Sequence, residues 1–218
     1  MKIKFLSILM IFPALLQGLN FGLSVPVGIV DNEDLSYGSF GKESAVYEYR
    51  YGTGVGVVID TNVVQENTFG YRLAFEYTVS DLYSSTRDSV TSLRRNKFEI
   101  VNTFAFGVVQ EPKFKWWVGP RLNMQFIKTS GSNISYQNSW GFGVAAATGI
   151  NYKIAERVAL ATDIEYHGNM MFGGESYQDD FSVFFGTTTG ATIRFYLLFV
   201  FEDKPKGSSV SLDSDNSF

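Results

Sequence analysis

The sequence predicts an all-β fold, an eight-stranded antiparallel up-and-down transmembrane β-barrel. Eight segments alternate between apolar and polar residues with a period of two, the pattern of a strand with two different faces. Aromatic residues make up 16% of the chain and charged residues 18%, against about 25% charged in ordinary soluble domains. The mean hydropathy is nevertheless +0.00, so the apolar residues must be balanced by polar ones on the opposite faces.

Composition also excludes several classes of protein. The 218 residues include no Cys, which rules out a disulfide-stapled scaffold. The formal net charge is -4 and no patch of Lys and Arg is present, so nucleic acid is excluded as a partner. No cofactor is expected.

The N-terminus has the features of a secretory signal peptide, assigned to residues 1–18. Lys2 and Lys4 precede an apolar run over residues 5–16, which is too short to cross a bilayer as a helix of about 20 residues. An uncleaved anchor or a buried helix is the alternative. Cleavage after residue 18 leaves 16 basic and 22 acidic residues, a net charge of -6.

The first four alternating segments occupy the amino-terminal half of the chain. Residues 19–29 place Leu, Phe, Val and Ile on one face, and residues 47–60 place Tyr, Val and Ile opposite Gly and charged residues. Residues 69–79 alternate large apolar side chains with small or charged ones. Residues 98–108 follow the same pattern, with Asn102 the one polar residue on the apolar face.

The last four segments repeat this design. Residues 114–126 and 158–167 oppose an apolar face to a face with isolated charges, and residues 140–152 oppose an apolar face to Gly and Ala. Residues 181–199 end in an aromatic-rich stretch. Alternation over about ten residues fits a tilted membrane-crossing strand of about 9–11 residues better than a globular strand of about 5–6.

The connections between the segments alternate in length. Residues 61–67, 110–113 and 153–157 form short connections, whereas residues 30–46, 80–97, 127–139 and 168–180 are predicted as longer polar loops. Short turns at one end and long loops at the other are typical of outer-membrane barrels.

Aromatic residues gather near the ends of the apolar faces, which favours an outward face in contact with lipid. A soluble exported ligand-binding barrel, with its apolar face inward, is the alternative, but the polar faces carry more Gly and Ala than a solvated surface would. The predicted aromatic girdle comprises Phe21, Tyr47, Tyr49, Phe69, Tyr71, Tyr77, Phe98, Phe114, Trp116, Trp140, Tyr152, Tyr166, Phe181 and Phe199.

These patterns resemble the small eight-stranded outer-membrane β-barrel family, of the OmpA transmembrane domain, OmpX and Opa type. The resemblance rests on the signal peptide, the eight alternations and the aromatic-rich last strand over residues 192–201, and it covers residues 19–201. It implies an outer-membrane location after export through the periplasm. It also implies three partners: outer-membrane lipid, lipopolysaccharide and the insertion machinery that reads a terminal Phe. Here Phe201 closes the strand, but a polar tail over residues 202–218, expected to be disordered, follows it.

Charged residues on the predicted inner faces must pair, because an isolated charge in a narrow lumen is costly. The expected ion-pair network comprises Glu48, Arg50, Asp60, Arg72, Glu76, Glu99, Arg121, Asp163, Glu165, His167 and Arg194. Asp163, Glu165 and His167 share one face and could form a metal or acid–base cluster, but a single His and no Cys favour a polar lumen instead. No metal site and no catalytic residue is therefore predicted.

A lipid-modifying barrel enzyme similar to the lipid A deacylases is the alternative function. That family has a His-x-Ser-Asn motif late in the chain, and here His167, Gly168 and Asn169 stand at a comparable place without the Ser nucleophile. The favoured function is structural or surface-interacting, through long extracellular loops that could contact an unidentified surface ligand.

Overall fold

The computed structural model describes residues 19–37, 43–64, 68–86, 90, 92–131, 134–177 and 180–201. The predicted signal peptide at 1–18 and the predicted tail at 202–218 lie outside the described residues. Within the described ranges, no helix is long and apolar enough to cross a membrane.

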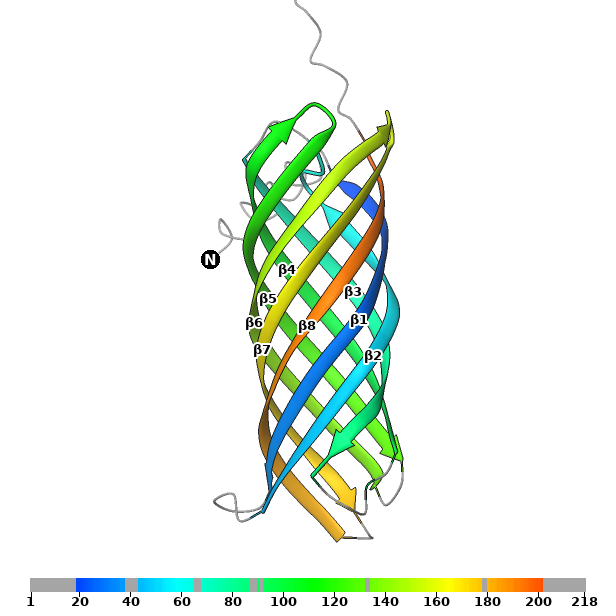
Figure 1. The fold of residues 1–218 in the computed structure, drawn as a ribbon, viewed down its shortest axis with the longest axis vertical. Coiled ribbons are helices and arrows are strands. Elements are labelled where there is room, and N and C mark those ends of the chain that lie inside the picture. Colours follow the sequence, from blue (N-terminus) through cyan, green and yellow to red (C-terminus); the bar gives the residue numbers. More distant parts are fainter. Residues whose placement is uncertain are drawn as a thin grey trace, which may run out of the picture.

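Eight antiparallel strands close into one barrel, as Figure 1 shows, and this confirms the predicted fold class. Each strand pairs with its neighbours in sequence, and the first strand pairs with the last to remove both sheet edges. The strands are β1 (Asn20–Tyr37), β2 (Glu43–Asp60), β3 (Phe69–Ser85), β4 (Leu93–Glu111), β5 (Phe114–Gly131), β6 (Ile134–Ala155), β7 (Val158–Tyr177) and β8 (Asp180–Phe199).

The two ends of the barrel differ in what they carry. We call the turn end the one where β1 starts and β8 stops, together with the connections β2–β3, β4–β5 and β6–β7; it is uppermost in Figure 1. We call the opposite end, which carries the other four connections, the loop end.

The predicted long loops are wrong in extent, because the strands continue through most of each. β1 runs on to Tyr37 and β4 already starts at Leu93, inside segments expected to be loops. Burial still alternates there, but many of the inward-facing residues are polar or charged, such as Asp31, Glu33 and Arg95. The apolar pattern fades in the sequence while the strand geometry persists, so a search for apolar alternation ends each strand too early.

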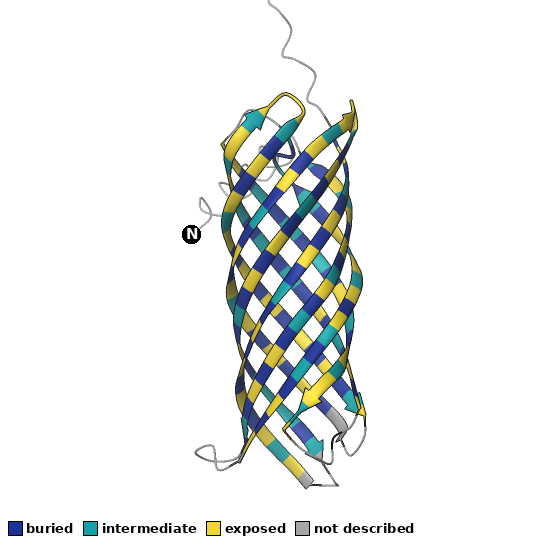
Figure 2. Ribbon diagram, viewed as in Figure 1, coloured by how far each residue is buried: buried dark blue, intermediate teal, exposed yellow. Residues whose placement is uncertain are grey.

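Burial alternates along every strand, as the bands of Figure 2 show. The outward side chains of the central part are large and apolar; Leu23, Val55 and Val144 are 52%, 65% and 63% exposed. The inward side chains are mainly polar. This barrel therefore has an apolar exterior and a charged interior, the reverse of a soluble barrel around an apolar ligand.

Two irregular sites change which face a side chain occupies. The pairing of β1 shifts register between Val27 and Asp31, where Gly28 has a φ of 61°. The pairing of β2 with β3 shifts between Arg50 and Thr53, and Tyr51 has a φ of 58°. A β-bulge adds one residue to one strand, so the alternation beyond it is reversed.

Two apolar clusters close the lumen near its ends. The loop-end cluster comprises Leu35, Tyr37, Ala45, Tyr47, Tyr49, Val90, Leu93, Ile127, Met171 and Phe184. The turn-end cluster comprises Val58, Val63, Ala74, Val101, Ala159, Ala161, Tyr196, Leu198 and Val200. Most of the charged residues of the lumen lie between these two clusters along the strands, whereas Asp60 and Arg72 lie beside the turn-end cluster.

Candidate functional site

The lumen holds a network of buried charges that extends from the turn-end cluster toward the loop end. Nine residues expected from the sequence contribute to it: Asp60, Arg72, Glu76, Glu99, Arg121, Asp163, Glu165, His167 and Arg194. All nine are at most 3% exposed. Burial without pairing would cost several kcal/mol per ion, so the contacts of these residues decide whether the barrel is stable.

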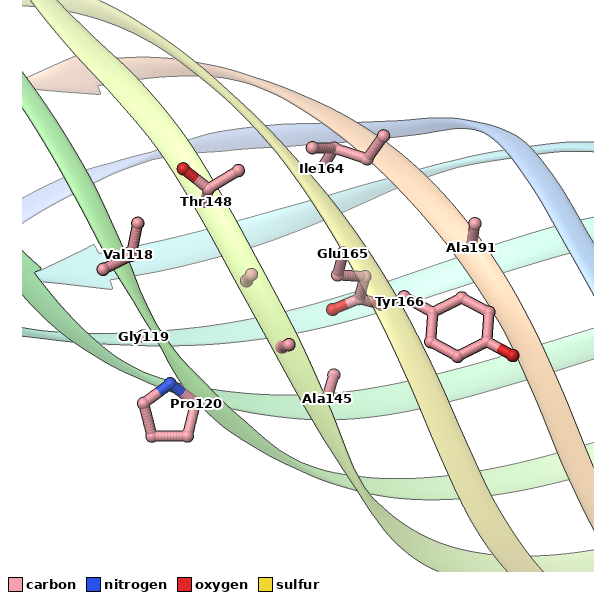
Figure 3. Close-up of a pocket in the computed structure, with 11 residues that line it drawn as sticks. Val118, Gly119, Pro120, Ala145, Thr148, Ile164, Glu165, Tyr166 and Ala191 are labelled. Atoms are coloured by element: carbon pink, nitrogen blue, oxygen red, sulfur yellow. The ribbon is translucent and has the colours of Figure 1, made fainter.

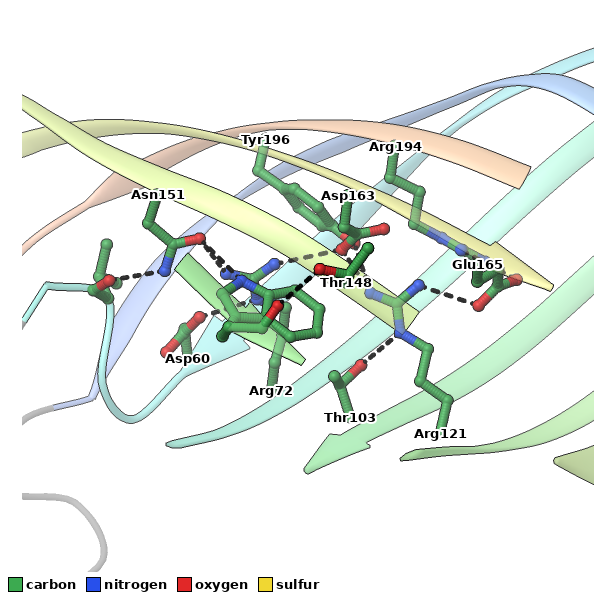
Figure 4. A network of polar contacts seen from close by, with 12 residues as sticks. Asp60, Arg72, Thr103, Arg121, Thr148, Asn151, Asp163, Glu165, Arg194 and Tyr196 are labelled. Atoms are coloured by element: carbon green, nitrogen blue, oxygen red, sulfur yellow. Dashed lines mark hydrogen bonds and ion pairs between the residues drawn. The ribbon is translucent and has the colours of Figure 1, made fainter. Parts of the chain in front are cut away.

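Arg72 anchors the part of the network near the turn end. Its Nε lies 2.7 Å from Asp60 Oδ2, and its Nη2 donates a hydrogen bond of 3.2 Å to Asn151 Oδ1. Its guanidinium carbon lies 4.4 Å from the ring centroid of Tyr196, which adds a cation–π contact. Figure 4 shows these side chains converging from different strands on the interior.

Arg121 and Arg194 hold the centre of the network. Arg121 forms an ion pair with Asp163 and lies 2.9 Å from Glu165 Oε2. Arg194 lies 2.9 Å from the other oxygen of Glu165 and 2.8 Å from Glu76. Glu165 thus joins two guanidinium groups from β5 and β8, so that the network crosses the lumen (Figure 4).

Four further charged residues complete the network toward the loop end, and the sequence prediction missed their role. Arg95 Nη1 and Lys97 Nζ lie 2.8 and 3.2 Å from Asp31 Oδ2, and Arg95 Nη2 lies 2.9 Å from Glu33. Lys97 also lies 3.1 Å from Glu99. All four were placed in polar loops, although the charges at 95, 97 and 99 already show the period of a strand.

Glu48 and Arg50 were expected in the lumen, but the structure places them on the outside. They pair with each other at 2.6 Å, and the Arg50 guanidinium lies 3.8 Å from the ring centroid of Tyr83. The irregular backbone around Tyr51 is the cause, because it reverses the faces of β2 beyond that point. For the same reason Tyr47 and Tyr49, expected in the girdle, are fully buried in the loop-end cluster.

His167 lies inside the network and does not reach the outer face. Its Nε2 lies 2.9 Å from Asp31 Oδ1, its Nδ1 lies 3.4 Å from Glu165, and the residue is 1% exposed. Asn169, two residues further on, also faces inward and is 3% exposed. Among the described residues, no group of three His, Cys, Asp or Glu side chains is arranged to hold a metal ion.

Four buried amide side chains line the β5–β7 side of the lumen without a hydrogen-bond partner in the described part of the chain. They are Asn123, Gln125, Gln137 and Asn169. Each is at most 3% exposed. An amide without a partner is a cost to stability, in contrast to the paired charges beside it.

The outer surface carries the aromatic girdle expected near the turn end. The rings of Phe69 and Phe106, and those of Tyr71 and Phe104, lie 5.5 Å apart between centroids on the neighbouring strands β3 and β4. Tyr71 also donates a hydrogen bond of 2.6 Å to Asn102 Oδ1, which explains how a polar residue is accommodated on the apolar face. The other outward residues of this belt are Phe21, Phe114, Trp116, Tyr152 and Phe199.

Nearer the loop end, six aromatic side chains from β3 to β8 stand next to one another in register. This aromatic row comprises Tyr77, Phe98, Phe126, Trp140, Phe172 and Phe185. Trp140 and Phe172 are stacked at 5.3 Å, and Phe181 stands on β8 beyond the row. Tyr166 does not belong to it, because it pairs with Ala146 and Ala191 closer to the middle of the barrel.

Tyr166 instead borders a shallow hollow in the outer wall, drawn in Figure 3. Its volume is about 690 Å³, and its lining includes Val118, Pro120, Ala146 and Ala191. Small side chains on neighbouring strands create the hollow, since the surrounding wall carries larger ones. Its lining is mainly apolar.

The comparisons with known proteins agree with this architecture. No family model and no curated protein matches the sequence. Among solved structures, the chain is similar to the outer membrane protein OprG from Pseudomonas aeruginosa, with a TM-score of 0.62, 8% identity, and coverage of 86% of this chain and 97% of that one. The fold is that of the outer-membrane β-barrels. The outer membrane protein AlkL, solved by solid-state NMR in DMPC bilayers, is also similar, with a TM-score of 0.55, 12% identity, and coverage of 88% and 93%.

Proposed function

We propose that the protein is an integral barrel of the bacterial outer membrane with a structural and surface-interaction role, and that it neither conducts solutes nor catalyses a reaction. The observation that carries this proposal is the lumen itself, which ion pairs cross and in which apolar clusters lie toward both ends. Such a barrel serves as a rigid anchor, and its accessible surfaces are the outer wall and the two ends.

The lumen supports a closed barrel because its charges are bound to one another. Glu165 contacts both Arg121 and Arg194, and Asp31 contacts Arg95 and Lys97, so a hydrated ion would have to break several buried pairs to pass. The two apolar clusters add a barrier at each end, because ions lose hydration there without compensation.

The position of His167 argues against an enzyme similar to the lipid A deacylases. Hydrolysis of an acyl ester in the membrane requires a nucleophile and a base on the lipid-facing surface. His167 and Asn169 both face the lumen, and His167 is engaged by Asp31. The chain also lacks the Ser of that motif.

The same proposal assigns the loop end to the cell exterior, since both described chain ends lie at the turn end. Lipid and lipopolysaccharide then surround the outer wall, and the insertion machinery reads the last strand. Phe201 supports the role of the last strand in insertion, because it joins the end of β8 to the start of β1. Its N–H donates a hydrogen bond of 3.0 Å to Asn20 Oδ1, and its ring contacts that of Phe21 edge-on, with 6.2 Å between the ring centroids.

Conductance across planar lipid bilayers tests the closed barrel. The folded protein, verified by a heat-dependent shift in gel migration, is expected to give no stepwise ion currents. Reproducible single-channel steps from the shifted species would overturn the proposal. Mass analysis of lipid A with and without expression tests the enzyme alternative, and an acyl loss that His167→Ala abolishes would establish it.

Surface interaction is tested by replacing the four loop-end connections, one at a time, with Gly-Ser sequences of equal length. The positions are residues 38–42, 86–92, 132–133 and 178–179. Loss of binding to a host-cell or bacterial surface with a retained gel shift supports the proposal. Binding that survives all four replacements contradicts a role for these connections.

A further inference from the structure

A second hollow in the outer wall lies across β3 to β6 on the loop-end side. Its volume is about 680 Å³, and its lining includes Tyr77, Asn96, Phe98, Phe126, Lys128 and Asn138. Unlike the hollow beside Tyr166, it combines an aromatic floor with a polar rim. The two parts come from successive rows of residues on the same strands, as the register shows.

The floor is a portion of the aromatic row. Phe98 and Phe126 are direct partners on β4 and β5, with ring centroids 6.4 Å apart. Tyr77 flanks Phe98 on β3, and its hydroxyl donates a hydrogen bond of 2.8 Å to Asn96 Oδ1. This floor can accept an acyl chain, because the rings expose their faces where the wall meets hydrocarbon.

The rim lies one row closer to the loop end and carries hydrogen-bond donors and positive charge. Asn96, Lys128 and Asn138 are register partners across β4, β5 and β6. Arg94 lies two residues before Asn96 and faces outward as well. Neither Lys128 nor Arg94 forms an ion pair within the described ranges, in contrast to Arg50, which Glu48 neutralises.

Charge on the outside of the loop-end half is distributed unevenly. Beyond the aromatic row, β4 and β5 present only the cations Arg94 and Lys128 among their described outward charges, whereas β1 to β3 present a mixture, Asp34, Glu48, Arg50 and Asp81. Asp81 is the register partner of both Arg50 and Arg94. The positive side coincides with the hollow. An anionic group is therefore favoured beside Lys128, whose register partners Asn96 and Asn138 are uncharged.

We propose that this hollow binds a phosphate-bearing lipid of the membrane leaflet at the loop end. Its acyl chain lies on Phe98 and Phe126, its phosphate pairs with Lys128 and Arg94, and the amides of Asn96 and Asn138 bind the polar groups of its headgroup. A lysine ammonium and an arginine guanidinium are both good phosphate ligands, and their pairing with an aromatic floor matches the amphipathic shape of a lipid. The inference rests on the membrane-spanning role proposed above.

Native mass spectrometry of the folded barrel in detergent tests the site. The probes are bisphosphorylated lipid A, the same lipid after removal of its phosphates, and inorganic phosphate. The barrel is expected to retain one phosphorylated lipid, and the double variant R94Q/K128Q is expected to lower the retained fraction at least fivefold. The matched control Arg50→Gln removes a cation outside the hollow and is expected to leave retention unchanged.

Comparing the probes and the variants decides between a lipid site, a site for the free anion and no site. Equal retention of the phosphorylated and dephosphorylated lipids, or equal retention by R94Q/K128Q and the unmodified chain, would overturn the proposal. Competition by inorganic phosphate at millimolar concentration would show that the site recognises the free anion and not a lipid, and would also overturn it. The gel shift verifies that each variant is folded. Channel activity is measured in a separate experiment and would refute the closed barrel. Its outcome does not change the lipid-retention result, so the two proposals can fail independently.

Discussion

His167 on β7 reaches Asp31 on β1 across the intervening strand β8, with 2.9 Å between His167 Nε2 and Asp31 Oδ1. The residue between them is Gly190, which is the register partner of both. A Cβ atom at this glycine would lie 2.9 Å from His167 Nε2 and would clash with Asp31 Oδ1 and with the backbone oxygen of Val30. The absence of a side chain at 190 is therefore what allows the contact between β1 and β7.

Replacing Gly190 with Ala is expected to destabilise the barrel by about 1–3 kcal/mol, the usual cost of overpacking a filled interior. The added methyl group must displace Asp31 and His167, and with them the ion pairs of Asp31 to Arg95 and Lys97. Urea unfolding in detergent micelles, followed by tryptophan fluorescence, measures the change in the free energy of unfolding.

Gly168→Ala provides the matched control. Gly168 neighbours His167 in the chain, yet a Cβ atom there meets no atom within 4 Å. Its substitution is expected to leave the unfolding midpoint close to that of the unmodified protein. Equal effects of the two substitutions would show that loss of a glycine, and not the contact between His167 and Asp31, sets the stability.

Arg121→Ala is expected to destabilise the fold by about 3–5 kcal/mol, because it leaves Asp163 and Glu165 buried without this partner. Arg50→Ala also removes an ion-paired arginine, but one on the outside of the barrel, and a much smaller change is expected there. The two unfolding curves are compared at the same pH and detergent concentration. A larger effect from Arg50 than from Arg121 would contradict the assignment of the lumen network.

The sequence was sufficient to predict eight strands, their antiparallel order and most of the inner charges, because period-two alternation reports directly which face a side chain occupies. It was insufficient at two kinds of position. Asp31, Glu33, Arg95 and Lys97 lie in strands whose inner face is charged, so no apolar alternation marks them. Tyr47 and Tyr49 lie beyond a register shift that strict alternation does not anticipate.

Single cysteines on β2 test this corrected orientation, since the chain has no cysteine of its own. A water-soluble maleimide is expected to label Val46→Cys quickly, because Val46 is 40% exposed near the loop end. Tyr47→Cys is expected to react at least tenfold more slowly, because Tyr47 is fully buried in the loop-end cluster. The two variants should react equally in urea, and faster labelling at 47 than at 46 in the folded state would restore the orientation predicted from strict alternation.

Two buried asparagines of the lumen provide an opposed pair of substitutions. Asn123 has no partner for either side-chain atom within the described residues, whereas Asn151 accepts hydrogen bonds from Arg72 and Trp117 and donates one of 2.6 Å to the backbone of Val63. Replacing an unpaired buried amide by an apolar side chain of similar size removes a desolvation cost, so Asn123→Leu is expected to be neutral or stabilising by about 1 kcal/mol. Asn151→Leu leaves three partners without their bonds and is expected to cost about 2–3 kcal/mol. Urea titration of both variants measures the difference, and a destabilisation by Asn123→Leu as large as that by Asn151→Leu would mean that the amide of Asn123 is bound in the folded lumen.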